Sequence, residues 1–323
     1  MNIFYPIQLL SDFLTYSVFK IAPKSLLASS VNFFIYDTTK IFILLIVIIF
    51  VVSVIRAYLP PEKIRVILSR KNKYIGNIFA SLLGIITPFC SCSAIPLFLG
   101  FIEAGVPLGT TFSFLVASPM INEVALILLL GMFGWKIAFI YIVSGLIISI
   151  LSGIIISKMK VKDLVEPFVY QNTLEARDTN LPKMAKKEIF TYAKDYTLDI
   201  LKSIWIYVVI GIAVGALIHG YVPADFLAQY AGSNKWYAVP IAVLIGIPLY
   251  SNAAGVIPLV SVLTEKGVSM GTTLAFMMSI TALSLPEFMI LKKVMKVKLI
   301  LIFATVVGIG ILLTGYLFNF VLG

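Results

Sequence analysis

The residues with the most distinctive chemistry in this chain are Cys90 and Cys92, its only two cysteines. They lie in the run Thr87-Pro88-Phe89-Cys90-Ser91-Cys92-Ser93-Ala94-Ile95-Pro96, where two prolines disfavour a regular helix. In extended backbone, residues two apart point to the same side, with Cα atoms about 6.6 Å apart. Two thiolates on one side suit a soft metal ion or a metalloid. The spacing predicts such a site at Cys90 and Cys92; the alternative is that both pack as small side chains.

Two glutamates inside apolar segments, Glu123 and Glu287, are the other candidates for chemistry. Ionisable side chains at membrane depth are costly and by default indicate a function. We expect both to contact substrate or carry a coupled proton, although Glu287 is close enough to Lys292 for a surface ion pair instead. The predicted substrate-binding residues are Cys90, Ser91, Cys92, Ser93, Ser118, Asn122, Glu123, Tyr250, Ser251, Asn252 and Glu287.

The composition is that of a protein surrounded by lipid. Of the 323 residues, 60% are hydrophobic and 12% are charged. Soluble domains are about 45–50% apolar and about one quarter charged. Several uncharged stretches approach the roughly 20 residues that a membrane-spanning helix needs. These stretches are 41–55, 137–156, 203–218 and 299–318.

Charge and motifs exclude several functions. The net charge is +10, but the basic residues lie between apolar segments, where they orient a membrane protein. No basic face interleaved with exposed aromatic residues is present, so we predict no nucleic-acid binding. The phosphate-binding pattern G-x-x-x-x-G-K-[ST] is absent, and two cysteines exclude a disulfide framework. We predict no cofactor and no enzymatic activity.

A shift of 162 positions aligns the second half of the chain with the first without a gap. Polar residues and glycines repeat as well as apolar ones, so shared hydrophobicity does not explain the match. The pairs include Gly84 with Gly246, Pro96 with Pro258, Glu103 with Glu265, Gly105 with Gly267, Gly109 with Gly271, and Lys136 with Lys298. Duplicated hydrophobic halves are typical of secondary transporters, which bind substrate near the bilayer midplane.

Corresponding loops of the two halves differ in charge. The stretch 56–73 is rich in Lys and Arg, whereas its equivalent, 218–235, has a single lysine. The bias reverses later, where Lys136 corresponds to part of the lysine-rich stretch 292–298. The positive-inside rule assigns 56–73, 158–198 and 292–298 to the cytoplasm, and 134–136 and 221–235 to the outside. The halves are therefore predicted to be inverted; the alternative, eight full crossings with parallel repeats, is opposed by these charges.

Inversion requires an odd number of crossings between residues 73 and 134, where two apolar segments lie, 74–103 and 107–133. As one helix, 74–103 would be about 45 Å long, against a hydrocarbon core of about 30 Å. Its proline-flanked polar run would break that helix. We therefore predict that 74–103 forms a re-entrant hairpin and that 246–258 lies at the tip of an equivalent one.

The predicted fold is an all-α polytopic membrane protein with two inverted-topology repeats. Each repeat has one spanning helix, one re-entrant helical hairpin and two further spanning helices, giving about six crossings and two hairpins. Residues 1–38 form an N-terminal interfacial segment, with one more crossing as the alternative. The further domains are the first membrane repeat, 39–157, the cytoplasmic linker, 158–198, and the second membrane repeat, 199–323.

The Pro-Phe-Cys-Ser-Cys-Ser run, with Glu103-Ala104-Gly105-Val106-Pro107-Leu108-Gly109 and Ser284-Leu285-Pro286-Glu287, resembles the predicted-permease family that includes the organoarsenical efflux permeases. The resemblance covers roughly residues 35–320. It implies a multi-span inner-membrane permease, some members of which export trivalent organoarsenicals through thiol contacts. Cys90 and Cys92 match the family's cysteine motif. This chain has Ser251-Asn252-Ala253-Ala254 where some arsenical exporters carry another cysteine.

We therefore predict a multi-pass secondary transporter of the inner membrane that moves a small, thiophilic solute, such as a trivalent organoarsenical or a sulfur species, with proton coupling. Its partners are the lipid bilayer, the solute and protons, and a homo-oligomer is compatible with the sequence. One alternative is a membrane thiol oxidoreductase using Cys90 and Cys92, which would want a Cys-x-x-Cys pair or a second redox centre. The other alternative is a passive channel, whose flux would persist without a proton gradient.

Overall fold

The structure, a computed structural model, describes residues 5–23, 25–58, 73–87, 91–159, 161–167, 169, 186–221, 236–249 and 253–322. These residues are helical apart from turns and one isolated antiparallel bridge between Val165 and Met295. The prediction of an all-α fold is confirmed for this part of the chain.

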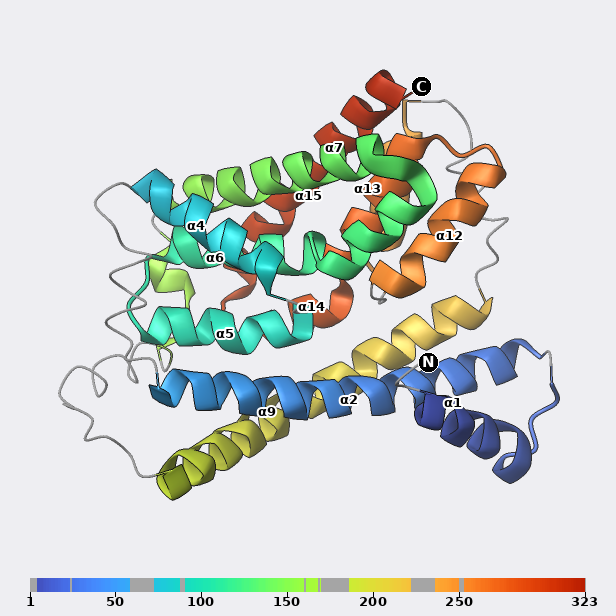
Figure 1. The fold of residues 1–323 in the computed structure, drawn as a ribbon, viewed down its shortest axis with the longest axis horizontal. Coiled ribbons are helices and arrows are strands. Elements are labelled where there is room, and N and C mark those ends of the chain that lie inside the picture. Colours follow the sequence, from blue (N-terminus) through green and yellow to red (C-terminus); the bar gives the residue numbers. More distant parts are fainter. Residues whose placement is uncertain are drawn as a thin grey trace.

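The helices follow the duplication of the sequence (Figure 1). The first half contains α1 (Tyr5–Asp12), the π-helix η1 (Phe13–Val18), α2 (Leu26–Tyr58), α4 (Lys73–Ile86), α5 (Ser91–Glu103), α6 (Leu108–Met120), α7 (Glu123–Lys158) and the short 3₁₀ helix η2 (Lys162–Leu164). The second half contains α9 (Lys186–Tyr221), α11 (Ala238–Gly246), α12 (Ala253–Glu265), α13 (Met270–Ala282), α14 (Leu285–Leu291) and α15 (Val297–Leu322).

Four described stretches are long and apolar enough to cross a membrane, judged by length and composition, and one of them includes both α13 and α14. They are Leu26–Val51, Ala125–Lys158, Met270–Leu291 and Val297–Leu322. Large apolar side chains, including Leu301 and Phe320 of α15, are exposed on these helices. In a membrane such side chains contact hydrocarbon, so their exposure is the expected state. The predicted multi-pass membrane protein is confirmed.

The two halves repeat each other in detail. Helices α5 and α12 begin and end at positions 162 apart, and so do α6 and α13. The turns between them are equivalent: Gly105 and Gly267 both take a left-handed conformation, with φ of 76° and 86°. In each turn the glycine N–H donates to a carbonyl three residues earlier, which satisfies an acceptor at the end of the preceding helix.

Equivalent glycines bring equivalent helices into close contact. A Cβ atom added at Gly109 would overlap the carbonyl oxygen of Gly153, where α6 meets α7. A Cβ atom added at Gly271 would likewise overlap the carbonyl oxygen of Gly315, where α13 meets α15. The sequence repeat therefore reflects a repeat of helix packing.

The halves pack against each other through equivalent pairs of helices. Helix α2 packs along α9, and the two run in opposite directions in Figure 1. Helix α7 packs on α15, α6 on α13, α12 on α7, and α14 on α5. The buried core continues across the contact between the halves: the ring of Phe112 lies 5.7 Å from that of Phe303.

The apolar segment 107–133 is interrupted. Helix α6 ends at Met120 and α7 begins at Glu123, because Asn122 adopts extended backbone with φ −95° and ψ 158°. The second half is interrupted at the equivalent place, where Ser284 is extended before α14. Helix α7 then continues to Lys158, and Gly134 is its one residue with non-helical backbone.

The N-terminal segment joins the first span directly. Helix α2 begins at Leu26 and is continuous through residue 38, the predicted end of the interfacial segment. Helix α1 packs on α2 through polar contacts: Asn32 Nδ2 donates to Asp12 Oδ1 at 2.7 Å, and Ser11 Oγ donates to the Asn32 carbonyl at 2.7 Å. Residues 25–38 are therefore joined to the span after them by a continuous helix, and to α1 before them by hydrogen bonds.

Candidate functional site

The break predicted in 74–103 separates α4 from α5. Helix α4 ends at Ile86, and Thr87 Oγ1 donates to the carbonyls of Leu83 and Gly84 at 2.9 and 3.1 Å. These bonds satisfy acceptors that the end of a helix leaves free. Cys90 lies outside the described residues, and of Ser91, Cys92 and Ser93 the structure describes only the backbone.

We expected extended backbone across Cys90–Cys92, and for Ser91 and Cys92 this expectation is wrong. Helix α5 begins at Ser91, so Cys92 lies in a first helical turn. Pro96, expected to prevent a helix, lies inside α5. Because proline has no N–H, the carbonyl of Cys92, four residues earlier, receives no helical hydrogen bond there. Pro258 has the same relation to Ala254 in α12.

In the second half, the corresponding break lies beside the α13–α14 junction. Tyr250, Ser251 and Asn252 lie outside the described residues. The N–H of Leu285, the first residue of α14, donates to the carbonyl of Ile247 at 2.9 Å. This bond links the end of α11 to the start of α14, so two predicted candidate regions meet there.

The junction between α6 and α7 brings three predicted residues together. Ser118 is fully buried near the end of α6. Asn122 caps α7: its Oδ1 accepts from the N–H of Ala125 at 2.7 Å. Glu123 is the first residue of α7, and its Oε2 is buried with no hydrogen-bond partner in the described part of the chain. A carboxylate at the start of a helix is favoured by the helix dipole.

Tyr141 closes this junction, and the sequence analysis missed it. Tyr141 is fully buried, and its hydroxyl donates to the carbonyl of Met120 at 2.7 Å. That carbonyl belongs to the last residue of α6, which has no helical donor. The available signal was a tyrosine in the uncharged and mainly aliphatic stretch 137–156. Its equivalent in the second half is Phe303, so only the first junction is held in this way.

The α13–α14 junction buries the second predicted acid. Glu287 is fully buried and so does not lie at the protein surface, whereas Lys292 is exposed. Ser284 precedes α14 at the position equivalent to Asn122. Its Oγ is buried without a hydrogen-bond partner among the described residues. The 162-residue shift was the signal that could have added Ser284 to the predicted site.

The helices that follow these junctions pack on the other half of the chain. Helix α7, which begins at Glu123, packs on α12, and α14, which carries Glu287, packs on α5. The helix after each junction therefore packs on the helix after the break in the other half, α12 or α5. No three His, Cys, Asp or Glu residues within the described ranges lie close enough to hold a metal ion. The arrangement offers buried carboxyl and hydroxyl groups at helix ends within an apolar core.

Comparisons with known proteins agree with this architecture. Residues 26–320 match the model of a family described as "Predicted permease". The chain is 25% identical to UPF0718 protein MJ0584 of Methanocaldococcus jannaschii, over 74% of this chain and 82% of the relative. It is 29% identical to a Streptococcus mutans protein named "Putative two-component membrane permease complex subunit", over 77% and 81%. It is 21% identical to UPF0718 protein YraQ of Escherichia coli, over 76% and 68%. No solved structure matches.

Proposed function

The chain belongs to the predicted permease family whose model covers its residues 26–320, and from that premise we propose that it is a proton-coupled secondary transporter with two inverted repeats. Its substrate is a small thiophilic solute, such as a trivalent organoarsenical or a sulfur species. The observation that carries the proposal is the duplicated set of broken helices, with a glutamate at the junction in each half. Broken helices at inter-repeat contacts are where secondary transporters bind substrate and coupling ions.

Two observations support the inversion. The equivalent helices α2 and α9 run in opposite directions in Figure 1. In addition, the linker touches the lysine-rich turn after α14: Glu166 N–H donates to the Val294 carbonyl at 2.9 Å, and Lys296 N–H donates to the Leu164 carbonyl at 2.8 Å. The loop charges assign both of these segments to the cytoplasm.

The short helices support the re-entrant hairpins. Helices α4 and α5 have 14 and 13 residues, which corresponds to about 21 and 20 Å. A hydrocarbon core of about 30 Å is longer than either helix. Two such helices joined by a turn can enter and leave the membrane on one side.

The buried acids support coupling to protons. Moving a carboxylate into an apolar core is unfavourable unless it is protonated or paired. Glu123, whose Oε2 makes no hydrogen bond in the described part of the chain, would therefore bind a proton when its junction is closed and release it when water enters, and Glu287 lies at the corresponding junction of the second half. Cys90 and Cys92, close to the start of α5, would supply soft ligands for the substrate.

Flux measurements on reconstituted protein test this function. Proteoliposomes containing the purified chain should transport methylarsenite when a proton gradient is imposed and stop when a protonophore collapses the gradient. Replacing both cysteines, Cys90→Ser with Cys92→Ser, should reduce the flux at least tenfold if thiols bind the solute. Unchanged flux in the double variant would refute the thiol site, and flux that ignores the gradient would identify a passive channel.

A further inference from the structure

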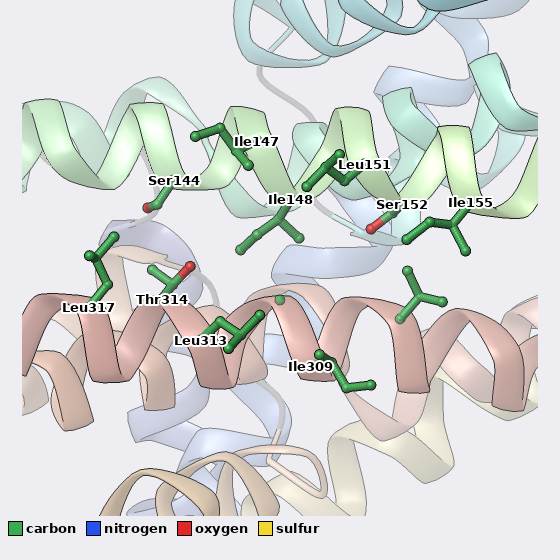
Figure 2. A pocket seen from close by; sticks show the side chains of 12 residues that line it. Ser144, Ile147, Ile148, Leu151, Ser152, Ile155, Ile309, Leu313, Thr314 and Leu317 are labelled. Carbon is green, nitrogen blue, oxygen red and sulfur yellow. The ribbon is translucent and has the colours of Figure 1, made fainter.

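A groove of about 400 Å³ lies between α7 and α15 (Figure 2). The lining is mainly aliphatic, and its members fall into pairs separated by 162 positions. Examples are Ile147 with Ile309, Leu151 with Leu313, and Ser152 with Thr314. The groove is therefore built equally by the two repeats.

The floor of the groove is the point where the two helices cross. A Cβ atom added at Gly310 would lie 3.0 Å from Cγ1 and Cγ2 of Ile148, so these two residues are in close contact. They are themselves an equivalent pair. Figure 2 shows that residue numbers rise along α7 in the direction in which they fall along α15. The helices are antiparallel, and the crossing at Ile148 and Gly310 is the local centre of pseudo-symmetry.

The rim of the groove faces the hydrocarbon of the membrane. Both helices are candidate spans, and the rim residues Ile147, Leu151 and Leu313 are 51%, 50% and 65% exposed. The hydroxyl of Ser144, at one end, donates to the Tyr141 carbonyl of its own helix and so does not require a polar ligand. The groove thus fits an apolar chain better than an aqueous solute.

One end of the groove carries two lysines on the same helix faces as the rim. Lys158 follows Leu151 by seven residues on α7, and Lys298 precedes Ile309 by eleven on α15; both spacings return to the same face of a helix. Both lysines are exposed. Because the helices are antiparallel, both lie at the same end of the groove.

These lysines are at the depth of lipid headgroups. Lys158 is about 15 Å along the helix from Ile148, and Lys298 is about 18 Å from Gly310. Half of a hydrocarbon core is about 15 Å. At the opposite end, the equivalents of Lys298 and Lys158 are Lys136 and Phe320. The groove is symmetric, but its two ends are not, and the charged end would orient a bound lipid.

The charge around that end is mostly positive. The turn between α14 and α15 adds the exposed Lys292, Lys293 and Lys296, and the adjoining linker segment brings the acidic residues Asp163 and Glu166. The basic residues outnumber the acidic ones, so the end favours an anion. Lysines near a membrane surface attract anionic headgroups.

We propose that the groove between α7 and α15 binds one anionic glycerophospholipid, with an acyl chain over Ile148 and Gly310 and its phosphate at Lys158 and Lys298. A second copy of the chain fits less well. Around a two-fold axis through the groove it would place concave surface against concave surface and leave a void, which protein interfaces avoid.

Native mass spectrometry of the purified full chain tests the headgroup contact. Titration with phosphatidylglycerol and with phosphatidylcholine should give one tightly held lipid, with phosphatidylglycerol preferred about tenfold or more. The double variant Lys158→Gln with Lys298→Gln should lose this preference. Lys136→Gln, at the other end of the same helix pair, is the matched control and should retain it. A loss of equal size in Lys136→Gln, or no preference in the unmodified chain, would overturn the proposal.

A second pair of variants tests the acyl chain. Val306→Phe would fill the groove from α15 and should lower the retained lipid several-fold. Leu301→Phe adds the same ring on α15 at an exposed position outside the groove and should leave the retained lipid unchanged. Equal lipid retention in both variants would contradict the proposal. So would a lipid-free dimer that Val306→Phe converts to monomer, because the groove would then join two copies. Neither readout depends on transport.

Discussion

At the scale of single residues, the α6–α7 junction depends on polar groups that satisfy the interrupted backbone. Asn122 caps the start of α7, and the hydroxyl of Tyr141 donates to the last carbonyl of α6. The second junction lacks the tyrosine, since Phe303 occupies its place. Buried acceptors without partners cost about 1–3 kcal/mol, so Tyr141 contributes to stability out of proportion to its single hydrogen bond.

Removing this hydroxyl should destabilise the protein. We expect Tyr141→Phe to lower the free energy of unfolding by about 1–3 kcal/mol, seen as a lower melting temperature in detergent. Phe303→Tyr is the reciprocal variant at the equivalent, fully buried position, where it would add a hydroxyl and also reduce stability. A melting temperature that is unchanged in Tyr141→Phe would mean that water replaces the hydroxyl.

Glu123 is the residue whose change should separate transport from stability. Its Oε2 makes no hydrogen bond in the described part of the chain, so Glu123→Gln should fold normally. We expect it to abolish proton-driven flux while leaving exchange of solute across the membrane. Glu265→Gln alters an exposed glutamate at the end of α12 and is the control. Full proton-driven flux in Glu123→Gln would remove this residue from coupling.

At the scale of helices, the repeat is a repeat of close packing. Helices α6 and α7 approach through Gly109 and Gly153, and α13 and α15 approach through Gly271 and Gly315. No side chain fits between them, because each added Cβ atom would meet a backbone carbonyl or a neighbouring Cβ. The short broken helices are therefore fixed against long spans, which hold the breaks at defined positions.

Small substitutions in these contacts should be costly. We expect Gly153→Ala and Gly315→Ala to destabilise the protein by about 1–3 kcal/mol each, as overpacking does. Gly131→Ala is the control: it lies in α7 with open space around its Cβ position, and alanine there should be neutral or stabilising by up to about 1 kcal/mol. Thermal unfolding in detergent measures all three. Equal melting temperatures would show that the helices shift apart easily.

At the scale of the whole molecule, the two halves enclose a core to which both contribute, and long helices of each half form its outer layers. Helices α2 and α9 lie together on one side, and α7 and α15 pair on another (Figure 1). The closest contacts between halves use equivalent elements, as expected when a duplicated unit packs around a pseudo-two-fold axis.

Labelling from the two sides of the membrane tests the inversion. In a background with Cys90→Ser and Cys92→Ser, the equivalent positions Asn72→Cys and Asn234→Cys should react with an impermeant maleimide from opposite faces. Lys158→Cys and Lys296→Cys should react from the same face as Asn72→Cys, because the linker pairs with the turn at Lys296. Labelling of positions 72 and 234 from one common face would refute the inverted topology.

The sequence alone determined the features that depend on neighbouring residues and on the internal repeat. Composition identified the membrane protein, the prolines located the break after α4, and the 162-residue shift predicted equivalent helices, which the bounds of α5 and α12 confirm. These properties are local, since a proline or a run of apolar residues acts on its own segment. The same local reasoning predicted that Pro96 would prevent a helix, and that was wrong.

Only the tertiary structure decided which distant groups meet. The hydroxyl of Tyr141 reaches the Met120 carbonyl, the N–H of Leu285 reaches Ile247, and Ile148 packs on Gly310. Each contact joins elements separated along the chain, and its geometry depends on how helices cross, which residue types alone do not specify. Hydrogen bonds and close packing act only over short distances, so they fix these contacts once the helices are in place.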